Sequence, residues 1–165
     1  MIDRAARDQL SRGLGRLVAG GITNDQFERS TPANVGDASI LAITAMSWLL
    51  YSDMKEHRLV GRHSLAPIWK KEVLRWVLFL DGDFEYRWPE ISLPGLPPMQ
   101  RARPVVTRWL SGPNAISYES ATEFLAAGDY NAWPFISRSE YKHALRHPRR
   151  LVGKPGSSRT EQFGI

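Results

Sequence analysis

The clearest periodic stretch of the chain is Leu65-Ala-Pro-Ile-Trp-Lys-Lys-Glu-Val-Leu-Arg-Trp-Val-Leu-Phe-Leu80. Its apolar residues recur at intervals of three and four positions, which is typical of an amphipathic α-helix. Ser64 is the expected N-cap of this helix, and Pro67 is tolerated in its first turn because the amide that proline lacks would be unpaired there. Asp81-Gly82 is expected to end the helix. The residues that follow the spacing are Leu65, Ile68, Trp69, Val73, Trp76, Val77 and Leu80.

A second apolar stretch, residues 37–51, precedes this helix in the chain. Asp37 can cap it, and apolar residues cover most of its surface as far as Tyr51. A helix that is apolar on nearly every side belongs in an interior. Hydroxyl residues interrupt the stretch, and it is shorter than the about 20 apolar residues that cross a bilayer. We therefore predict a mainly α protein, a compact helical domain built around these two central apolar helices.

The N-terminal residues are expected to form a helical hairpin. Residues 3–19 are amphipathic, with leucines on one face, and Gly20-Gly21 should end that helix. Thr23 or Asn24 can cap a second short helix. The segment Leu14-Gly-Arg-Leu-Val-Ala-Gly-Gly-Ile-Thr-Asn-Asp-Gln-Phe-Glu28 resembles the helical hairpin of bacterial short C-terminal domains. The resemblance implies a role in oligomerisation or partner contact.

The second half of the chain is expected to be irregular. Five prolines between Pro89 and Pro104 exclude long regular structure. Short helices are expected at 120–127 and from Ser137 to about Arg146. We predict one helical domain over residues 1–148, with 89–104 as the place for any subdivision, and a flexible basic tail at 149–165.

Composition limits the function classes. The chain has no cysteine, which excludes disulfides and cysteine zinc sites and fits a cytoplasmic protein. The residues near the N-terminus contain no long apolar stretch, so we do not expect a signal peptide. The net charge of +5 is compatible with nucleic acid, an anionic membrane surface or an acidic protein. Much of this charge lies late in the chain and is interpreted as a solvated tail, in Arg138, Lys142, Arg146, Arg149, Arg150, Lys154 and Arg159.

Three alternating acids, Asp81, Asp83 and Glu85, resemble the opening of a calcium loop. The later positions of such a loop need Gly and a bidentate Glu, and here they hold Tyr and Ser, so the match fails. The favoured interpretation is that the acids surround a helix end and pair with Arg75 or Arg87. An unfamiliar enzyme that uses the three acids is the alternative.

The histidines and glycines carry no complete catalytic or cofactor motif. His143 and His147 are four residues apart and could face one metal ion, but Ala144 stands where zinc proteases carry Glu. A Gly-x-Ser-x-Gly elbow, a phosphate loop and a full dinucleotide motif are all missing. We expect no metal and no cofactor.

Aromatic residues and arginines alternate in the irregular segments. Trp, Tyr and Arg are enriched at interface hot spots, and aromatic rings with cationic support also stack on bases. The same residues can simply pin loops to the core. The candidate partner-binding residues are Tyr86, Arg87, Trp88, Arg101, Arg103, Arg108, Trp109 and Trp133.

A wider resemblance rests on four segments, which are Gly21-Ile-Thr-Asn-Asp-Gln-Phe-Glu28, Trp48-Leu-Leu-Tyr-Ser-Asp53, Leu78-Phe-Leu-Asp-Gly-Asp-Phe-Glu-Tyr-Arg-Trp-Pro89 and Trp133-Pro-Phe135. Together they are similar to an uncharacterised bacterial protein family, over most of the chain. This resemblance implies no activity.

The leading functional prediction is a non-catalytic bacterial protein-interaction module, whose partner is another protein and not a membrane. One concrete form is an immunity or accessory protein that binds a cognate partner in a competition or defence system. The alternative is a nucleic-acid-binding protein that uses Arg101, Arg103, Arg108 and the basic tail. The third reading is the unfamiliar enzyme described above.

Overall fold

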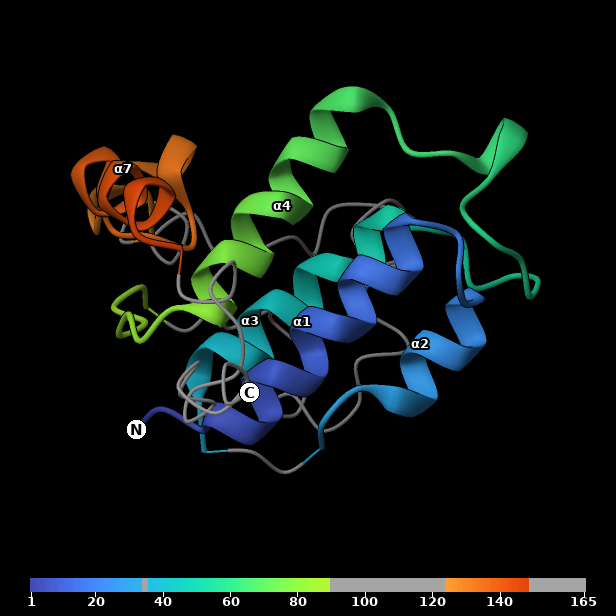
Figure 1. Ribbon diagram of the computed structural model, residues 1–165, viewed down its shortest axis with the longest axis horizontal. Helices are drawn as coiled ribbons and strands as arrows, with labels where there is room; N and C mark the ends of the chain where they lie inside the picture. Colours follow the sequence, from blue (N-terminus) through green and yellow to red (C-terminus); the bar gives the residue numbers. More distant parts are fainter. Residues whose placement is uncertain (34–35, 90–123, 149–165) are drawn as a thin grey trace, which may run out of the picture.

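Two helices from distant parts of the sequence, α1 (Arg4–Val18) and α4 (Pro67–Asp81), make the most extensive helix contact of the fold (Figure 1). The computed structural model describes residues 1–33, 36–89 and 124–148. In these ranges it contains helices, turns and one isolated bridge between Thr23 and Arg58, but no strand. The mainly α fold class is confirmed. The predicted subdivision at 89–104, apart from Pro89, and the tail at 149–165 lie outside the described residues.

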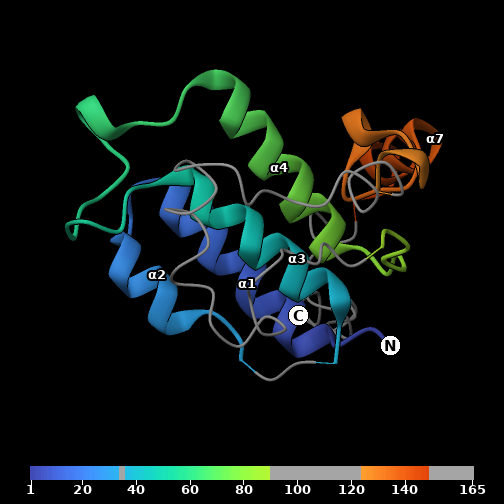
Figure 2. The ribbon, with the colours of Figure 1, turned by 180° about the vertical axis from the view of Figure 1, so that it is seen from behind.

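The remaining helices surround this pair. α2 (Asn24–Ser30) and α3 (Ala38–Ser47) both pack against α1, and α7 (Arg138–Arg146) packs against α4 (Figures 1 and 2). Short 3-10 helices lie between them, η1 (Trp48–Leu50), η2 (Gly61–His63) and η3 (Tyr130–Ala132). Because α1 contacts α2, α3 and α4, it is the helix around which the others are arranged.

Local capping explains where most helices begin. The Asp3 carboxylate accepts the Ala6 amide at 3.0 Å. Thr23 forms a full capping box with Gln26 at the start of α2. The predicted caps Thr23, Asp37 and Ser137 are confirmed as the N-caps of α2, α3 and α7.

Two local predictions are corrected. α4 begins at Pro67, and the residue before it makes no side-chain cap bond. Ser64 is not its cap, because the chain at 61–63 turns as η2 and the Ser64 amide donates to the Gly61 carbonyl at 3.1 Å. The helix after Asp37 ends at Ser47 and continues only as η1, so it is shorter than predicted.

The core is built from one face of each helix. Leu10, Leu14 and Leu17 of α1 are at most 1% exposed, and they belong to the same core cluster as the buried residues of α4. α3 buries Ile40 and Ile43, whereas Ala45 on its other side is exposed. The principal partner of α4 is therefore α1, whereas the sequence prediction paired α4 with the stretch at 37–51. The buried α4 residues are Val73, Trp76, Phe79 and Leu80.

A buried ion pair joins three elements at one end of the fold. Arg7 of α1 and Asp37 at the start of α3 have side chains that are 1% and 2% exposed. The pair is bidentate, with Nε to Oδ2 at 2.6 Å and Nη2 to Oδ1 at 3.2 Å. Arg7 Nη1 also donates to the carbonyls of Phe84 at 2.8 Å and Gly82 at 3.3 Å, just after α4. The guanidinium lies over the Phe79 ring, 5.2 Å from its centroid.

Other α1 side chains hold the same end of α4. The last carbonyls of a helix have no partner within the helix. Arg4 donates to the carbonyls of Leu80 and Gly82, the latter at 2.9 Å. The Ser11 hydroxyl donates to the Asp81 carboxylate at 2.7 Å. Polar side chains at the margin and within the buried face of α1 thus bind the end of α4.

The environment of Asp37 favours its charged form. Burial on its own raises the pKa of this carboxyl, but hydrogen bonds from Arg7, Ser39 and the Asp3 amide, together with the Arg7 charge, outweigh that effect. The pKa of Asp37 is therefore held below its ordinary value of 3.8.

We predict that Arg7→Met lowers the free energy of unfolding by about 3–5 kcal/mol, because it leaves the Asp37 charge buried without its partner. Urea denaturation measures this loss. Arg12→Met, on the exposed side of the same helix, is the control and should change stability by no more than about 0.5 kcal/mol. Equal effects of the two substitutions would contradict the central place of the ion pair.

We also predict a specific acid sensitivity. The pKa of Asp37 is lower in the folded protein than in the unfolded chain. The contribution of its charge to the free energy of unfolding is therefore complete above the unfolded pKa. The contribution is lost as the pH falls from that value through the folded pKa. The stability difference between the wild type and Asp37→Asn, measured by urea denaturation from pH 6 down to pH 3, should therefore shrink toward the acid end. A constant difference would count against a charged Asp37.

Candidate interaction surface

Two of the predicted partner-binding residues lie in an aromatic core. Trp88 and Trp133 are 4% and 3% exposed. Trp88 Nε1 donates to the Pro134 carbonyl at 3.1 Å, and Trp133 Nε1 donates to the Tyr86 hydroxyl at 3.3 Å. The Trp133 ring meets the Trp76 ring edge-on at 5.7 Å. In this conformation, both tryptophans stabilise the packing of residues 124–148 on α4.

Phe135 occupies the middle of this aromatic core. Its ring centroid lies 5.1 Å from those of Phe79 and Phe84, and 5.5 Å from that of Tyr141 in α7. Burial raises the pKa of Tyr86 to about 12, against the lowering effect of the hydrogen bond from Trp133. These rings attach α7 to the end of α4.

Of the predicted partner-binding arginines, Arg87 lies within the described residues and the other three do not. Arg87 is half exposed and forms an ion pair with Glu140. The other four predicted residues, Arg101, Arg103, Arg108 and Trp109, lie outside the described residues. The structure therefore brings together Tyr86, Trp88 and Trp133, and it leaves Arg87 beside them at the surface.

The three alternating acids do not form one site. Asp81 accepts the Ser11 hydroxyl, and Asp83 pairs with Arg4 at 3.3 Å. Glu85 is exposed. Two of the three acids hold α4 against α1, so their arrangement serves packing. Arg75, one predicted partner of these acids, instead pairs with Glu72 and donates to the Trp133 carbonyl.

The histidines form pairs. The rings of His143 and His147 are 4.8 Å apart, and those of His57 and His63 are separated by the same distance. Within 1–33, 36–89 and 124–148, no group of three or more His, Cys, Asp or Glu side chains could hold a metal ion.

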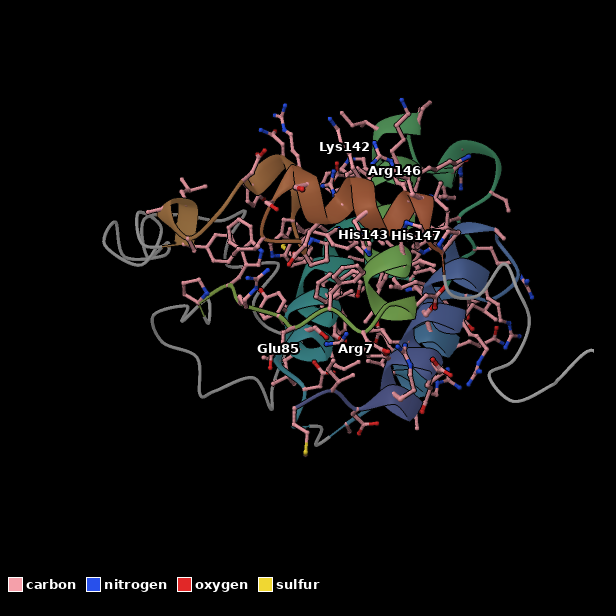
Figure 3. The ribbon with its side chains drawn as sticks, turned by 60° about the vertical axis from the view of Figure 1, so that its left-hand side comes forward. Arg7, Glu85, Lys142, His143, Arg146 and His147 are labelled. Atoms are coloured by element: carbon pink, nitrogen blue, oxygen red, sulfur yellow. The ribbon has the colours of Figure 1, made fainter. Side chains whose placement is uncertain are left out.

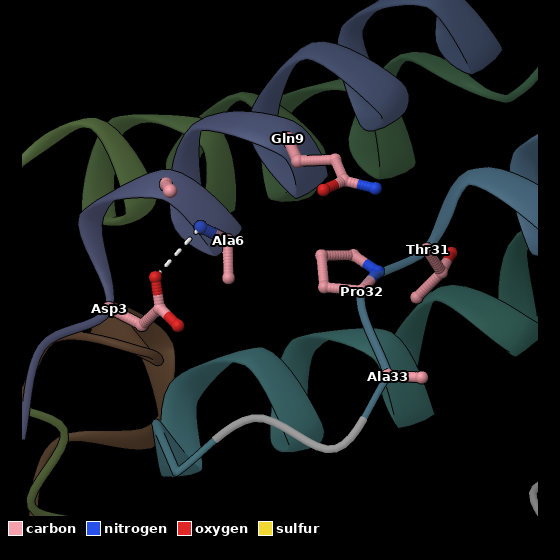
Figure 4. A pocket seen from close by; sticks show the side chains of 7 residues that line it. Asp3, Ala6, Gln9, Thr31, Pro32 and Ala33 are labelled. Atoms are coloured by element: carbon pink, nitrogen blue, oxygen red, sulfur yellow. Dashed lines mark hydrogen bonds between the residues drawn. The ribbon is translucent and has the colours of Figure 1, made fainter.

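A small surface pocket lies between the start of α1 and the loop that follows α2 (Figure 4). Its polar lining residues include Asp3, Gln9 and Thr31. Asp3 is occupied as the cap of α1, and the Gln9 amide donates to the Ser30 carbonyl at 2.7 Å. The lining thus combines no nucleophile with a base, and we assign no chemistry to it.

The outer face of α4 exposes apolar side chains. Ile68 and Leu74 are 67% and 65% exposed. At 100° per residue they flank Lys71 on the side of the helix opposite Val73 and Trp76. Sequence periodicity placed Ile68 on the buried face, and the structure corrects this.

Trp69 adds an aromatic ring to the same part of the molecule. It lies on the inner side of α4 but one turn before Val73, and it is still 36% exposed. The buried residues of α4 begin at Val73, and the apolar residues in its first turn stay accessible. Sequence spacing identifies a helix face but does not show how far a neighbouring helix extends along it.

The charge around these residues is positive. The sequence has no acidic residue from His57 to Lys71, and Arg62, Lys70 and Lys71 are exposed there. Glu72, the next acid, pairs with Arg75. We call the exposed group Ile68, Trp69, Lys70, Lys71 and Leu74 the α4 surface.

No helix among the described residues is long and apolar enough to cross a membrane. Comparison with known proteins finds no matching family model, no matching curated protein and no matching solved structure. The two resemblances drawn from the sequence therefore stay predictions, and function has to be inferred from the surfaces themselves.

We predict losses of stability of very different size for substitutions at two adjacent residues of the predicted site. Trp88→Ala should lower the free energy of unfolding by about 3–5 kcal/mol, because it leaves a cavity in the aromatic core. Arg87→Ala removes only a surface ion pair and should cost at most about 1 kcal/mol. Thermal denaturation followed by circular dichroism compares the two. A stable Trp88→Ala protein would show that this ring does not support the fold.

Proposed function

We propose that the protein is a non-catalytic protein-interaction module and that its α4 surface binds an acidic protein partner. The observation that carries the proposal is the exposure of Ile68 and Leu74 on a helix whose other face forms the core. Single exposed apolar residues are normal, but here two of them share one helix face, and a partly exposed tryptophan lies in the first turns of the same helix, toward its inner side.

The energetics favour a protein partner. Full burial of an aliphatic side chain contributes about 1.5–3 kcal/mol, and tryptophan is among the residues enriched at hot spots. Lys70 and Lys71 are placed to select an acidic partner and to accelerate its association. Because α4 is held by α1 and α7, the surface needs little reordering on binding.

The site chemistry supports a role without catalysis. Two of the three acids that an enzyme would use, Asp81 and Asp83, are engaged in packing α1 against α4, and Glu85 lies exposed. We propose a cytoplasmic location, in keeping with a chain that has no cysteine. An immunity or accessory protein with a cognate partner is one concrete form of this proposal.

We predict that Ile68→Ala/Leu74→Ala removes partner binding while the protein stays folded. The experiment is affinity capture from the native host, with mass spectrometry and nucleic-acid detection on the same eluate. The matched control is Met54→Ala/Leu125→Ala, which shortens two exposed apolar residues elsewhere.

The candidate partner is then purified, and its affinity is measured with each variant. The proposal expects one acidic protein that binds the wild type and the control equally, and the α4 double variant at least tenfold more weakly. Equal binding by both double variants would overturn the assignment of the α4 surface. An eluate that contains no directly binding protein would overturn the proposed function.

A further inference from the structure

The net positive charge of the chain comes from one segment, residues 141–160. Residues 1–140 contain sixteen basic and sixteen acidic residues, so they have no net charge. Residues 141–160 contain six basic residues and no acidic one. The whole excess therefore begins within α7 and continues in the sequence after it. The net charge of +5 therefore reflects where the excess of basic residues lies in the sequence, and not a basic composition along the whole chain.

The described part of this segment presents its cations on one face. Lys142 and Arg146 are one helical turn apart, both are exposed, and both lie on the outer side of α7, with His143 and His147 on its other side (Figure 3). The buried residue of α7 is Ala144, which faces the core. Arg138, one turn before Lys142, is exposed too, but it pairs with Asp129 at 2.6 Å.

Helix stability does not explain this arrangement. Like charges four residues apart destabilise a helix by about 0.2–0.5 kcal/mol. The helix dipole favours a cation in the last turn, which accounts for Arg146, but Lys142 lies a full turn earlier. Among the described residues, neither side chain forms an ion pair that would offset the repulsion.

We propose that the outer face of α7, formed by Lys142 and Arg146, binds the phosphate backbone of nucleic acid. Lysine and arginine side chains one turn apart can each reach a phosphate oxygen, and every contact releases a condensed counterion. Phosphate contacts carry no base-sequence information, and this face of α7 has no aromatic side chain that could stack on a base.

An anionic membrane would also attract cations, but it fits this face less well. An interfacial helix inserts a broad apolar face between lipids. The side of α7 that holds Lys142 and Arg146 also carries Ser139, and Leu145 at its margin is its one large exposed apolar residue. Nucleic acid is therefore the partner that the observations favour. This surface is separate from the α4 surface and does not depend on it.

The test is fluorescence anisotropy with a labelled 20-base-pair DNA duplex and a 20-nucleotide RNA, titrated with the full chain from 50 to 300 mM salt. The test variant is Lys142→Gln/Arg146→Gln. The matched control is Arg12→Gln/Arg16→Gln on α1, which removes two exposed cations at the same spacing and gives the same net charge. Circular dichroism verifies that both variants are folded.

The proposal expects binding by the wild type that weakens steeply with salt. The α7 variant should bind at least tenfold more weakly at 50 mM salt. Its salt slope should fall by roughly 2, because each phosphate contact contributes about 0.9. The control should keep both the affinity and the slope.

Three results would overturn the proposal. One is no binding of either nucleic acid at 50 mM salt, and another is an equal loss in both variants, which would reflect net charge alone. The third comes from a parallel titration with vesicles of about one third anionic lipid, and it is binding to these vesicles alone, which would assign the face to a membrane.

Discussion

The fold depends on one buried guanidinium. Arg7 satisfies the Asp37 carboxylate on one side and the carbonyls just after α4 on the other, and it covers the Phe79 ring. These contacts fix the start of α3 and the end of α4 relative to α1, although the three segments are far apart in sequence. A buried charge is tolerated only when its hydrogen-bonding capacity is used, and here it is used across three elements. Arg7 therefore contributes to the architecture from within the buried face of α1, beside Leu10 and Leu14.

This constraint also determines which surfaces remain for function. With its end held by α1, α4 turns Val73 and Trp76 inward and leaves Ile68, Lys71 and Leu74 outward. The aromatic residues that follow α4 then attach α7 to its end. Trp88 and Trp133, which the sequence predicts to bind a partner, are therefore buried in the aromatic core. Two exposed surfaces result, one apolar and basic on α4 and one cationic on α7. Each is carried by a helix that the core holds rigidly, which reduces the cost of binding.

The sequence predicted the parts of the fold that local chemistry determines. The caps at Thr23, Asp37 and Ser137 were predictable because an N-cap needs only a side chain and the amides two or three residues later. The burial of Arg7 was not predictable, because its partners Asp37 and Phe84 are 30 and 77 residues away in the sequence. A single arginine in a helical pattern also suggests an exposed face. Irregular segments have no periodicity, so Trp88 could equally have been a contact residue or a core residue. The α4 surface was hidden for another reason, because the apolar spacing already begins in the first turn of α4, whereas burial begins only at Val73.

The most direct test of this architecture is hydrogen–deuterium exchange of the Asp37→Asn protein, compared with the wild type. If Arg7 joins the three elements, loss of the Asp37 charge should accelerate amide exchange both in the first turn of α3 and in residues 80–84 after α4. Exchange in α2, which the pair does not contact, should stay unchanged. Acceleration confined to α3 would contradict the proposed link, because it would show that Asp37 acts there only as a helix cap.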